Sequence, residues 1–218
     1  MPDLSTLRKS HHIRSRSASH FFKAAAHASS HGRPLNLFVT LNLSHTGLSA
    51  ASTSPALAEI CSKFTRWLSY QSQKAVQQGF ADYGRPTYEA VIEAPNGIHH
   101  IHWLVHVPDD LQDLFKCTLP KWFSKVCGNV TKPEGAVHIE KVETVMALSR
   151  YLMKGVDPHH AKRCYVRPIN QGVVFGKRVA ISRSLGPRAR EKDKATSKNN
   201  HSATGSAAGH ESWRAPLP

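Results

Sequence analysis

The chain has 218 residues, a length that suits one folded domain with flanking tails. Its 29 Lys and Arg against 15 Asp and Glu give a formal net charge of +14, which favours a polyanionic partner, nucleic acid before an anionic membrane surface. No run of 18 apolar residues is present, and the N-terminus lacks the apolar stretch of a secretion signal. We therefore expect a cytoplasmic protein that makes no use of a membrane and keeps its four cysteines reduced.

The two ends of the chain differ in composition from its middle. Residues 1–34 are rich in Ser, His, Arg and Lys and lack sustained periodicity, so we expect a flexible basic N-terminal arm. Residues 187–218 are polar and basic and are expected to be disordered. These arms either add non-specific phosphate contacts or are solvated tails without a role. The folded domain is expected at residues 35–186.

The middle of the chain alternates between strand-like and helix-like patterns. Period-two alternation and β-branched residues predict strands at 35–43, 87–93, 96–107, 136–142 and 173–182. Apolar residues at helical spacing predict helices beginning at Ser54, over 109–126 and over 143–154. This order of elements predicts an α+β fold, an antiparallel sheet with helices packed on one face.

Residues 96–107 are the most informative strand. Because side chains two apart share a face, Ile101, Trp103 and Val105 are expected to pack on helices, while His100 and His102 point to the opposite face. A single His-apolar-His triplet is weak evidence for a metal site in a chain with 15 His. The prediction of a metal site therefore depends on the residues that surround the pair. Two neighbouring imidazoles off the core have the geometry of a divalent-metal site.

An acidic strand precedes the histidine strand, and Asn-Gly within residues 94–97 predicts a hairpin between them. With Glu93 opposite Ile98, Glu89 would lie opposite His102, so both carboxylates would share the face of the histidines. Two imidazoles and one carboxylate suit Mn²⁺ or Mg²⁺ that also holds a phosphate, or Zn²⁺ by ligand type. We favour Glu93 as the third ligand, with Glu89 as the alternative; either glutamate could instead be a solvated strand residue.

The helix predicted over 143–154 places Tyr151 and Lys154 one turn apart, at the edge of its core face. Such a tyrosine is commonly a core-edge residue with a wet hydroxyl, and such a lysine is commonly solvated. Beside a metal site that binds a phosphodiester, the phenol becomes a candidate nucleophile and the ammonium a candidate phosphate clamp.

Three stretches, in this order, resemble the HUH single-strand endonucleases, and within them the rolling-circle replication initiators. Residues 37–42 are similar to the family's first motif, His100-Ile101-His102 to its metal motif, and residues 151–154 to its Tyr-x-x-Lys nucleophile motif. Residues 176–182 are similar to the closing strand of phage-type initiators. With one tyrosine in the helix and no detectable helicase or phosphate-binding loop, the chain resembles the single-tyrosine subclass.

The resemblance implies a ferredoxin- or RRM-like nuclease core with a divalent metal, Mn²⁺ or Mg²⁺, on His100, His102 and Glu93. Tyr151 would attack single-stranded DNA at an origin or hairpin, leaving a 5′-phosphotyrosyl link and a free 3′-OH, while Lys154 steadies the phosphate or the phenolate. The implied function is initiation of rolling-circle replication of a plasmid or phage, with a host polymerase and helicase as partners.

Three other functions stay open on the sequence alone. A transposase or relaxase of a mobile element would use the same chemistry on different DNA. A catalytically silent nucleic-acid-binding module would keep the fold, the basic charge and exposed aromatics for stacking. A structural zinc protein would need a closed set of four ligands, and the cysteine spacing offers none.

Overall fold

The computed structural model describes residues 7–128 and 130–204, with side chains up to residue 196. The chain divides into two compact units, Met1–Gly186 and Pro187–Pro218. This division falls where the sequence predicts the end of the folded domain. In the described ranges, no helix has both the length and the apolar character needed to cross a membrane. The four cysteines are free thiols.

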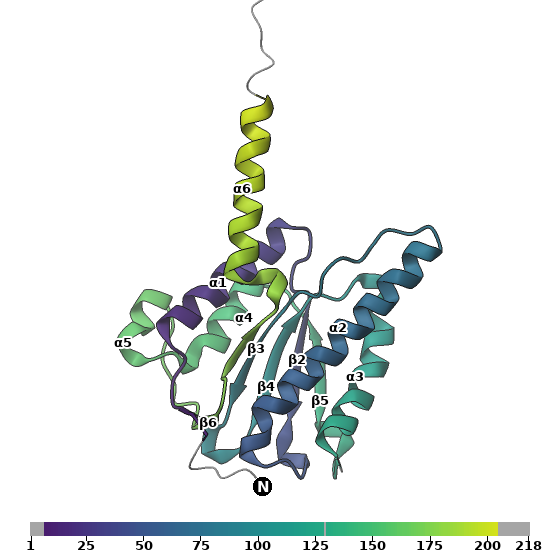
Figure 1. The fold of residues 1–218 in the computed structure, drawn as a ribbon. Helices are drawn as coiled ribbons and strands as arrows, with labels where there is room; N and C mark the ends of the chain where they lie inside the picture. Colours follow the sequence, from purple (N-terminus) through teal and green to yellow (C-terminus); the bar gives the residue numbers. More distant parts are fainter. Residues whose placement is uncertain (1–6, 129, 205–218) are drawn as a thin grey trace, which may run out of the picture. The chain divides into compact units, whose positions relative to one another are not determined.

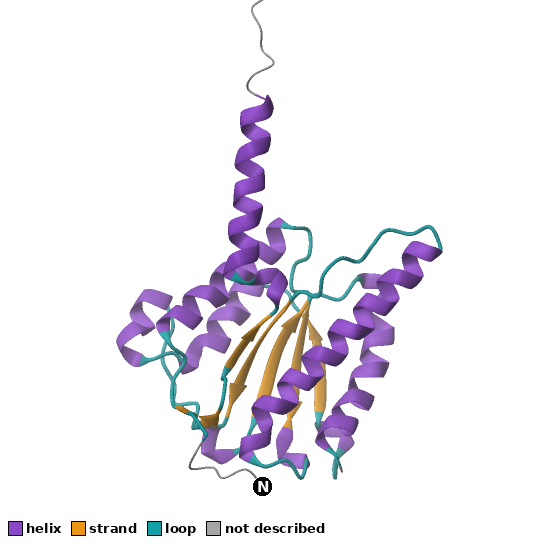
Figure 2. Cartoon of the chain, viewed as in Figure 1, coloured by secondary structure: helices purple, strands orange, loops and turns teal. Residues whose placement is uncertain are grey.

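The first unit is built on a five-stranded antiparallel sheet (Figure 2). The strand order is β5-β2-β4-β3-β7, so the histidine strand β4 lies in the centre, between the first strand and the acidic strand. The strands are β2 (Leu37–Asn42), β3 (Tyr88–Glu93), β4 (His100–Val105), β5 (Val137–Lys141) and β7 (Val179–Ile181). The predicted α+β class with an antiparallel sheet is confirmed.

Two long helices, α2 (Thr53–Gln77) and α3 (Gln112–Cys127), cover one face of this sheet (Figure 1). Trp103 is fully buried at its centre, and its ring meets Phe64 edge-to-face at 5.3 Å between centroids and Phe115 at 6.0 Å. The buried strand residues on this face are all apolar, as the alternation of β4 predicts.

Helices α1 (Ser15–Ser30) and α4 (Val145–Leu152) cover the opposite face, so helices pack on both faces and not on one as expected. The expected flexible arm is corrected here, because residues 15–30 form a regular helix. Its Phe21 is fully buried in a second apolar cluster together with Phe38 and Leu104 of the sheet. Residues 1–6 of the predicted arm lie outside the described residues.

The segment between Gln171 and Arg178 contacts the end of β3 and includes one of two short strands. Strand β1 (Lys9–Ser10) pairs with β6 (Val174–Phe175), and the predicted strand over 173–182 is divided between β6 and β7 at Gly176, where φ is 92°. The buried Arg178 guanidinium donates to the carbonyls of Ser10 (2.7 Å) and Gly172 (2.6 Å). The Ala94 amide donates to the Gln171 carbonyl at 2.9 Å, which fixes the chain directly after Glu93.

Two helices remain. In the first unit, the short α5 (Pro158–Ala161) follows α4 and packs on the second apolar cluster through Ala161. In the second unit, α6 (Pro187–Thr204) is a helix, which corrects the expectation of a disordered tail for these residues. Residues 205–218 of that predicted tail lie outside the described residues.

Candidate metal and tyrosine site

The hairpin between β3 and β4 brings the acidic strand beside the histidines. Asn96 and Gly97 both have positive φ, 53° and 78°, the conformation that Asn-Gly turns adopt most easily. The register pairs Glu93 with His100, whereas the sequence analysis expected Ile98 at that position. Because this shift is two residues, every side chain keeps its predicted face. The shift does place Glu89 opposite Leu104, away from His102.

His102 is held in one orientation by three neighbours. Its Nδ1 lies 3.1 Å from the Thr40 hydroxyl, and its ring stacks on Phe38 with 5.6 Å between centroids. Its Nε2 lies 3.4 Å from Glu93 Oε2. The hydroxyl partner on Nδ1 fixes the ring and directs Nε2 toward the Glu93 carboxylate.

His100 lies beside His102 with the two rings nearly parallel, 6.3 Å between centroids and 11° between planes. Partial burial, followed by the neighbouring charge of His102, lowers the pKa of His100 below its ordinary value. A lowered pKa keeps this imidazole neutral near pH 7, and the neutral form is the one that binds a metal.

Glu93 is only 3% exposed and still ionised. Burial alone would raise the pKa of its carboxyl, but the hydrogen bond from His102 and the charges of His102 and Lys154 outweigh burial and lower the pKa. Lys154 Nζ lies 3.0 Å from Oε2, while Oε1 is buried without a hydrogen-bond partner among the described residues. Of the two candidate carboxylates, Glu93 is therefore the one beside the histidines, with one oxygen open to a further partner.

Tyr151 of α4 completes the group. Its side chain is 49% exposed, and its ring centroid lies 6.2 Å from that of His102. Lys154, in the single 3₁₀ turn that follows α4, places Nζ 3.7 Å from the centroid of the Tyr151 ring. The ammonium thus lies against both the Glu93 carboxylate and the tyrosine. Residues that the sequence analysis selected from two distant segments meet on one face of the sheet.

The donor set suits a divalent cation in its chemistry. Two imidazoles and an ionised carboxylate are ligands that Mn²⁺ accepts, and the buried Oε1 of Glu93 has no hydrogen-bond partner among the described residues. The ligand atoms are not gathered into a closed set: within the described part of the first unit, no three His, Cys, Asp or Glu ligand atoms all lie within 4.8 Å of one another. Lys154 holds the cationic position at Glu93 instead.

The remaining histidines of this strand lie outside the group. His99 Nδ1 is 3.1 Å from the Thr53 hydroxyl of α2, so its ring has a partner on the face opposite to the site. His106 Nδ1 donates to the Pro34 carbonyl at 2.8 Å, at the other end of the strand. Phe38 and Thr40 were not predicted as neighbours of His102, although the alternation of residues 37–42 places both on the histidine face.

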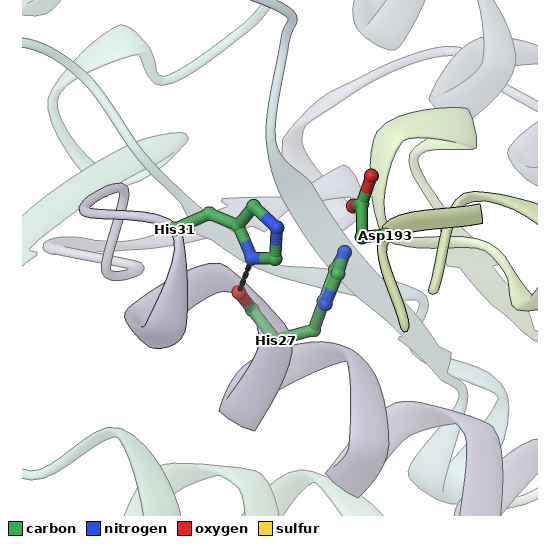
Figure 3. A group of neighbouring side chains, drawn as sticks. All are labelled: His27, His31 and Asp193. Atoms are coloured by element: carbon green, nitrogen blue, oxygen red, sulfur yellow. Dashed lines mark hydrogen bonds between the residues drawn. The ribbon is translucent and has the colours of Figure 1, made fainter. Parts of the chain in front are cut away.

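A separate histidine pair lies at the end of α1 (Figure 3). His31 Nδ1 donates to the His27 carbonyl at 3.0 Å, and the two ring centroids are 4.0 Å apart. Figure 3 also draws Asp193, which belongs to the second unit. Because the positions of the two units relative to one another are not determined, we assign no site to the three residues.

Comparison with known proteins gives no match: no family model, no curated protein and no solved structure is similar to the chain. We therefore infer the function from the residues of the site and from their geometry.

Proposed function

We propose that this protein nicks and rejoins single-stranded DNA through Tyr151 and thereby initiates rolling-circle replication of a plasmid or phage. The observation that carries the proposal is the position of an exposed phenol 6.2 Å, ring to ring, from one of two parallel imidazoles. If Tyr151 only packed at the edge of the core, its position would not require two neighbouring histidines and a buried carboxylate. The net charge of +14 suits a nucleic-acid substrate.

In the proposed reaction, the Tyr151 oxygen attacks the scissile phosphorus. An O–P bond to tyrosine forms as the bond from phosphorus to the 3′-oxygen breaks, and that oxygen takes up a proton to become a free 3′-OH. The phenol proton leaves to solvent. One phosphodiester replaces another, so the reverse attack by a 3′-OH rejoins the strand.

Lys154 has two possible partners in this reaction. Its ammonium lies against the ring of Tyr151, so its charge would stabilise negative charge on the attacking oxygen or on the phosphate that approaches it. His100, His102 and Glu93 would hold Mn²⁺ or Mg²⁺, which when bound would supply electrophilic polarisation of the phosphate. Contacts with Thr40 and Phe38 hold the ring of His102 in its present orientation.

The proposal implies partners that act on the products of nicking. A host polymerase would extend the 3′-OH, and a host helicase would separate the strands, which places the activity in the cytoplasm. A transposase or relaxase would share the chemistry and differ in the DNA that it recognises. A silent binding module would bind DNA without forming a covalent link.

An oligonucleotide with one dye at each end tests the proposal. After incubation with Mn²⁺, we expect a protein band, resistant to boiling in SDS, that carries the 3′ dye and lacks the 5′ dye. Tyr151→Phe should remove the band and keep DNA binding. Tyr70→Phe, a matched control at a tyrosine that is 62% exposed on α2, should keep it. An adduct that persists in Tyr151→Phe would refute the nucleophile, and no adduct with the wild type would favour the silent module.

A further inference from the structure

The short helical segment after α4 ends at a residue of unusual conformation. Tyr165 has φ 52° and ψ 42°, the left-handed region. Its amide donates to the Lys162 carbonyl at 3.2 Å, and the Val166 amide donates to the Ala161 carbonyl at 3.2 Å. These two bonds form a Schellman motif, in which the left-handed position is usually a glycine because a Cβ is unfavourable there.

The fold gains little packing from this tyrosine. Ala161 is buried in the second apolar cluster, and Cys164 and Val166 pack against it from either side of Tyr165. Tyr165 itself is 83% exposed, the most exposed of the large hydrophobic residues in the described part of the chain. Its ring makes no hydrogen bond, cation contact or ring contact among the described residues. A strained backbone that displays such a ring to solvent suggests a function for the ring.

The surroundings of Tyr165 are cationic. Lys162, Arg163 and Arg167 are exposed, and none of the three makes an ion pair within the described ranges. Between residues 158 and 186 the sequence contains no Asp or Glu. The segment also returns to the tyrosine site, because the Ile169 amide donates to the Lys154 carbonyl at 2.7 Å.

We propose that Lys162, Arg163, Tyr165 and Arg167, here called the Tyr165 turn, bind single-stranded nucleic acid. A base stacks on the Tyr165 ring, and phosphates on either side of that base contact the flanking cations. An aromatic face together with exposed cations suits a single strand, whose bases are unpaired and available for stacking. The inference rests on the proposed function in taking this strand to be the DNA that Tyr151 cleaves.

Binding of a labelled oligonucleotide, measured by fluorescence anisotropy in EDTA, tests the ring separately from any cleavage. Tyr165→Gly should weaken binding about tenfold. Its melting temperature should equal or exceed that of the wild type, since glycine suits the left-handed position. Tyr165→Phe keeps a stacking face and should bind within about twofold of the wild type. The control Tyr70→Ala should bind as the wild type does. Wild-type affinity in Tyr165→Gly would overturn the proposal.

The cations have their own test. Arg163→Gln with Arg167→Gln should reduce the slope of log affinity against log salt by about 1.4, which is ~0.7 for each lost phosphate contact. Arg66→Gln with Lys74→Gln removes the same charge from the exposed surface of α2 and should leave the slope unchanged. Equal slopes for the two double variants would contradict phosphate contacts at the Tyr165 turn.

Two outcomes separate this inference from the proposed nicking. If Tyr165→Gly weakens DNA binding while the wild type forms no covalent adduct, the Tyr165 turn is supported as a DNA-binding surface and the nicking function is refuted. Vesicles of phosphatidylserine and phosphatidylcholine provide the competing partner. If Tyr165→Gly weakens binding to these vesicles and leaves DNA binding unchanged, the Tyr165 turn is a membrane contact and the nucleic-acid proposal is overturned.

Discussion

The two faces of the central sheet are both covered by helices but differ in what they bury. Under α2 and α3 the buried strand residues are all apolar, with Trp103 at their centre. Under α1 and α4 the same strands bury Glu93 and His102 among apolar residues. Burying ionisable groups costs free energy that an apolar side chain would not. We infer that the first face serves stability, whereas the second gives up stability to hold chemically useful groups.

The largest expected effect lies on the apolar face. Trp103→Ala removes a fully buried ring that contacts Phe64 and Phe115, so the free energy of unfolding should fall by about 3–5 kcal/mol in denaturant titration. Trp103→Phe should lose much less, because the indole N–H has no hydrogen-bond partner among the described residues. If Trp103→Ala cost less than the Glu93 variant below, the contrast between the faces would fail.

A smaller effect is expected on the polar face. Glu93→Gln leaves Lys154 without its carboxylate partner and should lower the free energy of unfolding by about 2 kcal/mol at pH 7. The folded-state pKa of Glu93 lies below the ordinary value of 4.5, so its contribution is complete above pH 4.5 and is lost as the pH falls through the folded pKa. Denaturant titrations in EDTA from pH 7 to pH 3 should show the wild type and the variant converging. A constant difference would contradict the ionised carboxylate.

The smallest expected effect concerns the cation at Glu93. Lys154 and a metal ion would compete for the same carboxylate, so Lys154→Met should bind Mn²⁺ about fivefold more tightly, which corresponds to about 1 kcal/mol. Isothermal titration calorimetry measures this change, with Lys74→Met on α2 as the control. Weaker Mn²⁺ binding in Lys154→Met would mean that the lysine supports the metal site and does not compete with it.

Local patterns predicted which side chains lie near one another more closely than they predicted the helices and the hairpin register around them. The alternation in β4 and the spacing of Tyr151 and Lys154 depend on backbone periodicity alone, and the structure brings these residues together. The hairpin register was misplaced, because it depends on how the turn closes around Asn96. The predicted face of each strand side chain is still correct, because the register error was an even number of residues.

Helix α1 was missed for a different reason. Its buried face is made largely of alanines, Ala18, Ala24, Ala25 and Ala28, which give little apolar contrast against a Ser- and His-rich background. These alanines form a packing surface only because the helix contacts Phe38 and Leu104 of the sheet. Such a contact between distant segments is not visible in a local sequence pattern.

The most direct test of the central proposal is the chemical identity of the residue linked to DNA. Trypsin cleaves after Arg150 and Lys154, so Tyr151 lies in the tetrapeptide Tyr-Leu-Met-Lys, separate from every other tyrosine of the chain. After incubation with Mn²⁺ and single-stranded DNA, then nuclease and trypsin digestion, mass spectrometry should find this peptide carrying a nucleotide through its phenol. A nucleotide on any other peptide, with this one unmodified, would contradict the account.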